Sequence, residues 1–267
     1  MSNSLKTVFR DLLPMRYQVP VKYWYNWVRG ALEAEMNFIE VIVQKNDRVI
    51  DIGGNRGIYA YELWRRGALV EVFEPNPKCC RVLEAWASGR ANVRVHSVAL
   101  SCRTGTARLH IPIDGSCVEH DASGSIEHSG FALARDQIVP LHTLDSYQFE
   151  EIRLIKIDVE GHESSVIEGA ALTIASSKPA LLIEIEQRHI HKPILEVFDK
   201  VLGFGYRGFF VGKQGLTPLS AFNVDRHQSI EKSGTLKDPY VNNFLFLHRK
   251  RLANGEYSAL GYDKELN

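Results

Sequence analysis

The stretch RVIDIGGNRG, residues 48–57, is an apolar, strand-like run that ends in a turn with three glycines. In wound α/β sheets the first strand ends at the binding crevice, and glycines there let a nucleotide-like ligand approach backbone N–H groups. Gly53, Gly54 and Gly57 suit that role. The stretch therefore predicts a wound α/β fold with a ligand at the end of its first strand.

The spacing of these glycines separates classes of ligand. A dinucleotide turn has the pattern GxGxxG, and Asn55 and Ile58 stand where its second and third glycines belong. No Gly-Lys-Ser/Thr follows, which excludes a Walker loop. The pattern that remains, Asp-x-Gly-x-x-x-Gly on Asp51, Gly53 and Gly57, suits S-adenosylmethionine, which has no phosphate. Asp51 and the turn backbone are expected to satisfy its ammonium and carboxylate groups.

An acidic residue follows the second predicted strand, in VEVFEP. Glu74 lies 21 residues beyond Gly53, where a carboxylate can accept both hydroxyls of a ribose. Taken singly, Asp51 can be a turn cap and Glu74 a surface charge at a strand end. Because both stand at the right strand ends and spacing, together they predict an adenosyl cofactor.

Composition sets the broad class of the protein. Of 267 residues, 45% are apolar and 24% charged, as in ordinary globular proteins, and 32 basic residues balance 32 acidic ones. The balance disfavours a nucleic-acid partner. No run approaches the roughly 20 apolar residues of a membrane span, and the start lacks a signal-like apolar core, so we expect a soluble, cytoplasmic protein. The four cysteines lack CxxC spacing, which favours reduced thiols over disulfides or zinc.

From residue 46 onward, short β-branched runs alternate with segments of helical period, as a parallel sheet with crossover helices requires. The expected strands are 48–52, 69–74, 93–98, 153–158, 180–186, 205–211 and 243–248. The expected helices of this part cover 76–89, 162–175 and 191–203. We divide the chain into a helical accessory segment (1–45), a main domain (46–248) and a polar tail (249–267).

The accessory segment is basic and aromatic at its start. Residues 1–32 carry five Lys or Arg against one Asp, beside several tyrosines and tryptophans. Peripheral contact with a membrane surface or glycolipid is one interpretation. The other, which we favour, is a helix packed on the main domain with its basic side chains reaching solvent.

Two departures from regular alternation indicate further structure. Thr104-Gly105 predicts a turn of a small hairpin between two extended segments. The polar stretches 114–137 and 212–242 are too long for simple connections, so we expect these loops to cover or shape a site.

Seven segments in order carry a resemblance to a known family. They are VIDIGGNRGIYA, VEVFEPNP, VALSCRTGTARLHI, VPLHTLDSY, IRLIKIDVEGHESSVIEGA, ALLIEIE and NNFLFLH. Over about residues 46–248 they resemble the FkbM-type S-adenosylmethionine-dependent methyltransferases, and IKIDVEGHE is their most specific part. Gly54 and Arg56 depart from the family pattern.

The resemblance implies a Rossmann-like class I methyltransferase fold, a mostly parallel seven-stranded sheet with helices on both faces. It also implies S-adenosyl-L-methionine as cofactor and methylation of a hydroxyl on a carbohydrate, glycolipid or secondary metabolite. The expected cofactor residues are Asp51, Gly53, Asn55, Gly57, Glu74, Pro75 and Ala99. Alternatives are a non-catalytic cofactor-binding scaffold and methylation of a protein or nucleic-acid nitrogen, although DVEG replaces the Asn/Asp-Pro-Pro-Tyr/Phe motif of the latter. An NAD-linked reductase conflicts with the broken GxGxxG.

The strand 153–158 should end at the same sheet edge as Asp51. Methyl transfer is an in-line displacement that depends on alignment, and a base near the acceptor hydroxyl contributes roughly a hundredfold. We name Asp158, Glu160 and His162 as candidate catalytic residues. At a helix start the dipole favours a neutral imidazole, although a packed histidine explains His162 equally well.

A second polar group follows the strand 180–186. Glu184 and Glu186 share one face because side chains alternate along a strand, and with His189 and Asp158 they form a candidate site for sugar hydroxyls or a divalent ion. We expect no metal. Asn243 reaches the acceptor side or serves a turn.

Overall fold

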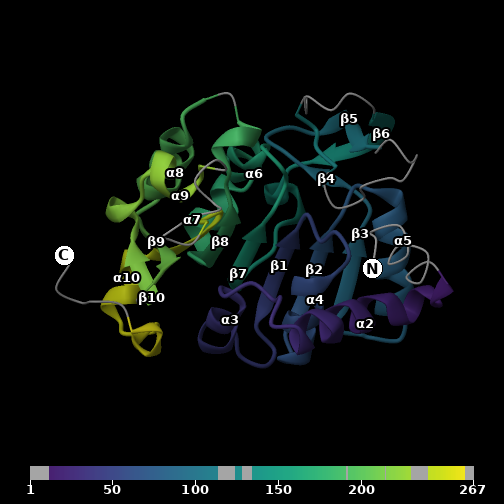
Figure 1. The fold of residues 1–267 in the computed structure, drawn as a ribbon, viewed down its shortest axis with the longest axis horizontal. Helices are drawn as coiled ribbons and strands as arrows, with labels where there is room; N and C mark the ends of the chain where they lie inside the picture. The colour runs from purple at the N-terminus through teal and green to yellow at the C-terminus, as the bar shows by residue number, and fades with distance from the viewer. Residues whose placement is uncertain are drawn as a thin grey trace.

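A computed structural model of the protein describes residues 12–113, 124–127, 134–190, 192–213, 215–229 and 240–261. An eight-stranded sheet forms its centre, in the order β10-β9-β11-β8-β7-β1-β2-β3 (Figure 1). The strands are β1 (Arg48–Ile52), β2 (Leu69–Phe73), β3 (Val93–His96), β7 (Ile152–Ile157), β8 (Ala180–Glu184), β9 (Tyr206–Gly212), β10 (Gly215–Pro218) and β11 (Asn243–His248).

All seven expected strands are present, but the sheet has eight strands rather than seven. The additional strand, β10, lies within 212–242, which the sequence predicted as a loop. Gly215 pairs opposite Gly212 in an antiparallel ladder between β10 and β9. Two glycines in a polar stretch, Gly212 and Gly215, predict a turn. The four-residue strand β10, which begins at Gly215, is too short to show alternation.

The sheet reverses its winding between β1 and β7. Strands β1, β2 and β3 pair in parallel on one side, and β7 and β8 continue in parallel on the other. In this sheet β11, between β8 and β9, and β10 at the edge run opposite to the other six strands. Ligands of such folds bind beyond the carboxyl ends of the strands at this reversal.

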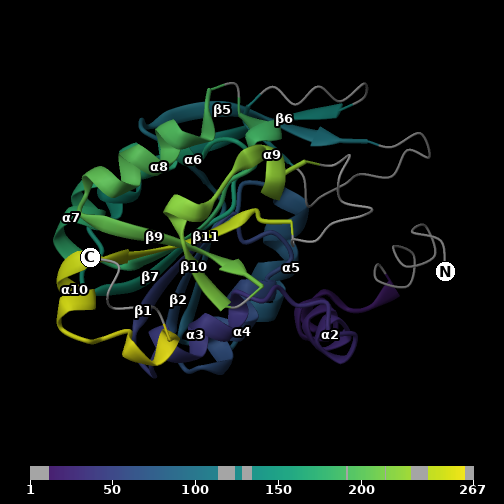
Figure 2. The ribbon, with the colours of Figure 1, turned by 60° about the vertical axis from the view of Figure 1, so that its left-hand side comes forward.

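Helices cover both faces of the sheet. They are α2 (Met15–Val28), α3 (Met36–Ile42), α4 (Ile58–Arg65), α5 (Pro77–Ala87), α6 (Glu163–Glu168), α7 (Ala171–Ser177), α8 (Ile194–Gly203), α9 (Val224–His227) and α10 (Arg249–Ala253). Figure 2 shows α3, α4 and α5 on one face, with α2 outside them, and α6, α7 and α8 on the other. Alternate strand residues feed the two cores: Val49 packs with the first layer and Ile50 with the second.

Helix α5 confirms its predicted ends. The Asn76 side chain accepts a hydrogen bond from the Lys78 amide, and Pro77 occupies the first turn. The single helix expected over 162–175 is wrong, because the chain breaks at Gly169 into α6 and α7. A Cβ at Gly169 would lie 1.9 Å from the carbonyl oxygen of Ser101, so the break admits a neighbouring backbone.

A small three-stranded sheet lies beyond one end of the main sheet (Figure 1). It contains β4 (Ala99–Leu100), β5 (Gly105–Pro112) and β6 (Ala134–His142), in the order β4-β6-β5. The expected hairpin at Thr104-Gly105 is wrong, because β4 and β5 both pair with β6. Strand β6 was not predicted because its first residues are charged and it contains Pro140. Most of the predicted loop 114–137 lies outside the described residues.

The described ends of the chain are helical and packed. Helix α2 contacts α5 and α4, and Tyr257 near the other end is buried. None of the described helices is both long and apolar enough to cross a membrane. Cys79, Cys80 and Cys102 are free thiols, as predicted, and Cys117 lies outside the described residues.

Candidate functional site

A pocket opens where β1, β2 and β7 end, beneath the small sheet. It brings together eight of the ten predicted site residues: Gly53, Asn55, Glu74, Pro75, Ala99, Asp158, Glu160 and His162. The remaining lining residues are Ile52, Phe73, Asn76, Val98, Leu100, Leu109, Gly124, Ile126 and Val159. The pocket therefore lies at the reversal of the sheet, where the fold places ligands.

Glu74 is held by backbone amides on both sides of its carboxylate. The N–H of Asn55 donates to one oxygen at 2.6 Å, and the N–H of Asn76 donates to the other at 2.7 Å. Burial raises the pKa of Glu74 to about 7, although these two hydrogen bonds act to lower it. Each carboxylate oxygen keeps a further lone pair, so Glu74 can accept a ligand's hydroxyls in a fixed orientation.

The glycine turn packs closely against the next strand and does not leave its amides free for a ligand. The N–H groups of Gly53 and Gly54 both donate to the carbonyl of Phe73, at 2.9 and 3.1 Å, and that of Gly57 donates to Gly54 at 2.8 Å. Together with Asn55, these amides are already paired, so the expectation that they face the ligand is wrong. A tight turn satisfies its own donors.

Gly53 has a stricter steric role. It adopts φ +79°, and a Cβ there would lie 1.8 Å from the carbonyl oxygen of Asp158. The Asp158 amide in turn donates to Ile52 at 2.9 Å. The ends of β1 and β7 thus approach too closely for any side chain at position 53.

Asp51 and Gly57 lie behind the pocket and do not line it. Asp51 is buried, and one of its carboxylate oxygens has no partner among the described residues. Burial raises its pKa to about 6, against the attraction of Lys156. Gly57, at φ +75°, begins α4 and packs against Leu83 and Val19. Both residues support the turn from below.

The Asp-x-Glu-Gly segment after β7 puts two carboxylates at the pocket wall. Burial raises the pKa of Asp158 to about 7, while Lys156 opposes the rise and Glu160 adds to it. The Glu160 carboxylate lies 2.8 Å from Nδ1 of His189, and its carbonyl accepts from the Ser125 hydroxyl at 2.7 Å. That ion pair raises the pKa of His189. Asp158 is therefore a pocket carboxylate that can exchange a proton near neutral pH.

His162 is anchored on both ring nitrogens. Its Nδ1 lies 2.7 Å from a Glu127 carboxylate oxygen, and its Nε2 lies 2.9 Å from the Ser101 hydroxyl. It precedes α6, as predicted, and lines the pocket. Because neither nitrogen is open, the geometry favours the packed interpretation of His162 over a proton acceptor.

A buried lysine sits at the centre of a polar network beside the pocket. Lys156 donates to Asn243 at 3.0 Å, and Asn243 donates to Glu33 at 3.1 Å. Glu33 also accepts from the Tyr59 hydroxyl. Asn243 thus joins β7 to the segment between α2 and α3, a structural role rather than a lone turn.

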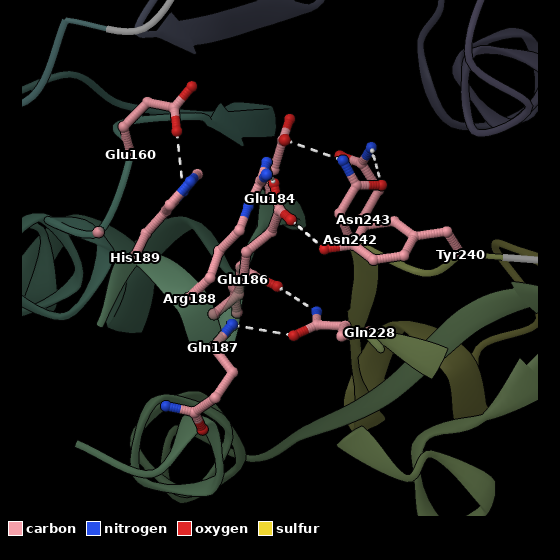
Figure 3. A network of polar contacts seen from close by, with 12 residues as sticks. Glu160, Glu184, Glu186, Gln187, Arg188, His189, Gln228, Tyr240, Asn242 and Asn243 are labelled. Atoms are coloured by element: carbon pink, nitrogen blue, oxygen red, sulfur yellow. Dashed lines mark hydrogen bonds and ion pairs between the residues drawn. The ribbon is translucent and has the colours of Figure 1, made fainter. Parts of the chain in front are cut away.

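The cluster expected around Glu184 and Glu186 is divided among separate partners (Figure 3). Glu184 accepts from Asn242 at 2.8 Å, whereas Glu186 pairs with Arg188 at 2.8 Å and accepts from Tyr240. His189 faces Glu160 instead, as Figure 3 shows. Among the described residues, no group of three or more His, Cys, Asp or Glu side chains is arranged to hold a metal ion.

The buried carboxyls near the pocket make stability depend on pH. Burial raises the pKa of Asp51 to about 6 and those of Glu74 and Glu163 to about 7. A carboxyl with a higher pKa in the folded state binds its proton more tightly there than in the unfolded chain. Its contribution is therefore fully present at acidic pH, and the free energy of unfolding falls as pH rises through about 4 to 7.

Glu163→Gln tests this dependence, because one Glu163 oxygen accepts from the Gly161 amide and the other has no partner among the described residues. Urea unfolding of the wild type should show lower stability at pH 8 than at pH 5, and the variant should lose less over that interval. Equal losses in both proteins would contradict a buried, ionising Glu163.

Several residues of the site escaped prediction. Ser101 and Glu127 anchor His162, and Glu33 reaches the network from the presumed accessory segment. Lys156 inside an apolar strand was a visible signal of the polar network, since a buried lysine needs polar partners. The contacts of Ser101 and Glu127 span 61 and 35 residues, and no local pattern indicates them.

The methyltransferase FkbM domain model matches residues 51–207, more than half of the chain. The chain belongs to this family. Among curated proteins, the FkbM chain is 28% identical over 164 residues to the 2-O-methyltransferase NoeI of Sinorhizobium fredii, covering 56% of this chain and 68% of NoeI. The match to the domain model confirms the predicted FkbM methyltransferase family.

Solved structures give weaker likenesses to this FkbM domain. The FkbM methyltransferase of Methylobacillus flagellatus has a TM-score of 0.49 and 16% identity, with coverage of 77% of this chain and 44% of that protein. Fibrillarin of Aeropyrum pernix, with natively bound S-adenosyl-L-methionine, has a TM-score of 0.42 and 10% identity, covering 77% of this chain and 68% of its own. The chain thus spans less than half of the first of these structures.

Proposed function

We propose that this chain is an S-adenosylmethionine-dependent O-methyltransferase acting on a hydroxyl of a carbohydrate, glycolipid or secondary metabolite. The observation that carries the proposal is the Glu74 carboxylate, held by two backbone amides at the pocket wall. Asp158 and Glu160 line the wall formed by the end of β7. Similarity to a 2-O-methyltransferase supports a hydroxyl as the acceptor.

The residues at the pocket fit the proposed cofactor. Glu74 offers a fixed carboxylate to the two ribose hydroxyls. Val98 and Leu100 give apolar walls for a flat base. Gly53 keeps the turn free of a side chain where β1 meets β7. In this assignment Asn55, Pro75 and Ala99 contact the cofactor directly, whereas Asp51 and Gly57 act through the turn.

The chain's own residues align the acceptor and remove its proton. When bound, S-adenosylmethionine supplies a methyl group on a positively charged sulfur. Asp158 takes the proton of the acceptor hydroxyl as the oxygen attacks, and later releases it to solvent. Glu160, fixed by His189, binds a neighbouring hydroxyl of the acceptor. Since the pKa of Asp158 is raised to about 7, turnover should rise as pH increases through that value.

Asp158→Asn should lower kcat about a hundredfold, because the amide cannot accept the proton. Calorimetry should show binding of S-adenosylhomocysteine within about threefold of wild type, since a lost base does not affect the ribose contacts. Glu163→Gln is the matched control: Glu163 is a neighbouring buried carboxyl, also with a pKa of about 7, that does not line the pocket. Unchanged turnover in Asp158→Asn would remove the assigned base.

The activity itself is tested with methyl-labelled S-adenosylmethionine and panels of glycans and metabolites. Each sugar is offered with a free 2-hydroxyl and as its 2-deoxy counterpart. The expected result is label on an oxygen of at least one free-hydroxyl acceptor. Cofactor binding without transfer to any acceptor would favour the scaffold alternative, and label on nitrogen would contradict the proposed acceptor class.

A further inference from the structure

Helix α2 carries an outward stripe of large apolar side chains. Tyr17, Val21, Trp24, Tyr25 and Val28 are between 41% and 75% exposed. Their spacing of 4, 3, 1 and 3 residues places them on one face of a helix. Twelve large hydrophobic side chains are well exposed in the described part of the chain, and the stripe supplies five of them.

 Counted over its whole length, α2 holds seven of those twelve side chains, more than the rest of the described chain together.

The opposite face of α2 is buried against the protein. Gln18, Val19 and Tyr23 are buried, and the helix packs on α5 and α4 (Figure 2). Val19 reaches the glycine turn at Gly57, and Gln18 accepts from Arg56 at 3.1 Å. Apart from Trp24, which donates to the Tyr61 hydroxyl of α4 at 3.3 Å, the stripe therefore faces away from the main domain. The inner face of the same helix supports the candidate cofactor turn.

Basic side chains flank the stripe on both sides. At 100° per residue, Arg16 lies on one side of it, and Lys22 and Arg29 lie on the other. Arg16 stacks over Tyr17 at 4.7 Å, and Arg29 over Tyr25 at 5.2 Å. No acidic residue occurs from position 12 to position 32. Aromatic and aliphatic side chains between basic flanks are typical of helices that lie in a membrane interface.

We propose that this stripe docks on the surface of an anionic lipid bilayer, with α2 lying in the interface plane. Charge complementarity favours lipid over a second copy of the chain, because a symmetric dimer would bring two sets of three basic side chains together without acidic partners in the helix. Docking would bring the glycine turn within about one helix diameter, roughly 10 Å, of the lipid headgroups.

Vesicle sedimentation of the full chain tests the proposal, with phosphatidylcholine vesicles that contain or lack phosphatidylserine. The wild type should bind the anionic vesicles and lose that binding at high salt. Val21→Ser/Val28→Ser should lower the partition coefficient about tenfold through lost apolar contact. Leu172→Ser/Leu195→Ser, which removes two comparably exposed leucines elsewhere, is the matched control and should bind as wild type does.

A charge variant separates lipid binding from self-association. Arg16→Gln/Arg29→Gln should weaken binding to anionic vesicles about twentyfold, with little effect on neutral ones. Circular dichroism checks that each variant keeps its helices. Absence of wild-type binding to anionic vesicles would overturn the proposal. So would a wild-type dimer in sedimentation equilibrium that Val21→Ser/Val28→Ser converts to a monomer, because the stripe would then be a subunit interface.

Discussion

Glu74→Gln should weaken the binding of S-adenosylhomocysteine by two to three orders of magnitude, about 3–4 kcal/mol. The carboxylate accepts two backbone N–H bonds and, in the proposed complex, two ribose hydroxyls. Hydrogen bonds to a charged group contribute about 1.5–3 kcal/mol each. A glutamine side chain turns one acceptor into a donor, which then faces either the Asn55 or the Asn76 amide. Titration calorimetry at pH 8, where Glu74 is ionised, measures the loss.

Glu71→Gln is the control for this substitution. Glu71 is a buried glutamate within β2, three residues before Glu74, but it pairs with His96 at 2.7 Å and does not line the pocket. Its replacement should leave cofactor affinity within about threefold of wild type, since Glu71 pairs with His96 and Arg94 of the neighbouring strand and not with the pocket. Equal losses in the two variants would indicate general damage to β2 and would remove the assigned role of Glu74.

Gly53→Ala should have the largest effect on stability, about 3 kcal/mol or more. The alanine Cβ would lie 1.8 Å from the Asp158 carbonyl oxygen, which belongs to backbone and cannot rotate away. The residue would also have to keep φ +79°, which is unfavourable for any side chain. Urea unfolding measures this loss. Calorimetry should show no cofactor binding, because the ends of β1 and β7 must separate to admit the alanine side chain.

Gly89→Ala separates the steric effect from the backbone effect. Gly89 has nearly the same conformation, φ +80°, but nothing lies within 4 Å of its added Cβ. Its replacement should cost only about 1–2 kcal/mol, the usual penalty for a left-handed residue with a side chain. If Gly53→Ala cost no more than Gly89→Ala, the close approach of the two strand ends would be wrong.

The parts of the fold that follow from local pattern were predictable. The β-branched runs of β1, β7 and β8 are buried on both faces, so they stand out as apolar segments. The ends of α5 follow from Asn76 and Pro77. The pocket followed from the rule that parallel strands end at one edge, which correctly brought Gly53, Glu74 and Asp158 together.

What depends on distant contacts was not predictable. His162 is anchored by Ser101 and Glu127, and both contacts form only when the small sheet packs over the pocket. The amides of the glycine turn find partners in Phe73, at the end of β2, and in Glu74, which follows it; a sequence pattern does not reveal these contacts. Strand β6 pairs with two strands that precede it, and its own residues alternate too weakly to show it.

The most direct test of the central claim is a crystal structure of the chain with S-adenosylhomocysteine. We expect both ribose hydroxyls within hydrogen-bonding distance of Glu74, and the sulfur in the pocket beside Gly53 and Asp158. A nucleoside bound elsewhere, with the Glu74 carboxylate contacted only by the amides of Asn55 and Asn76, would contradict it.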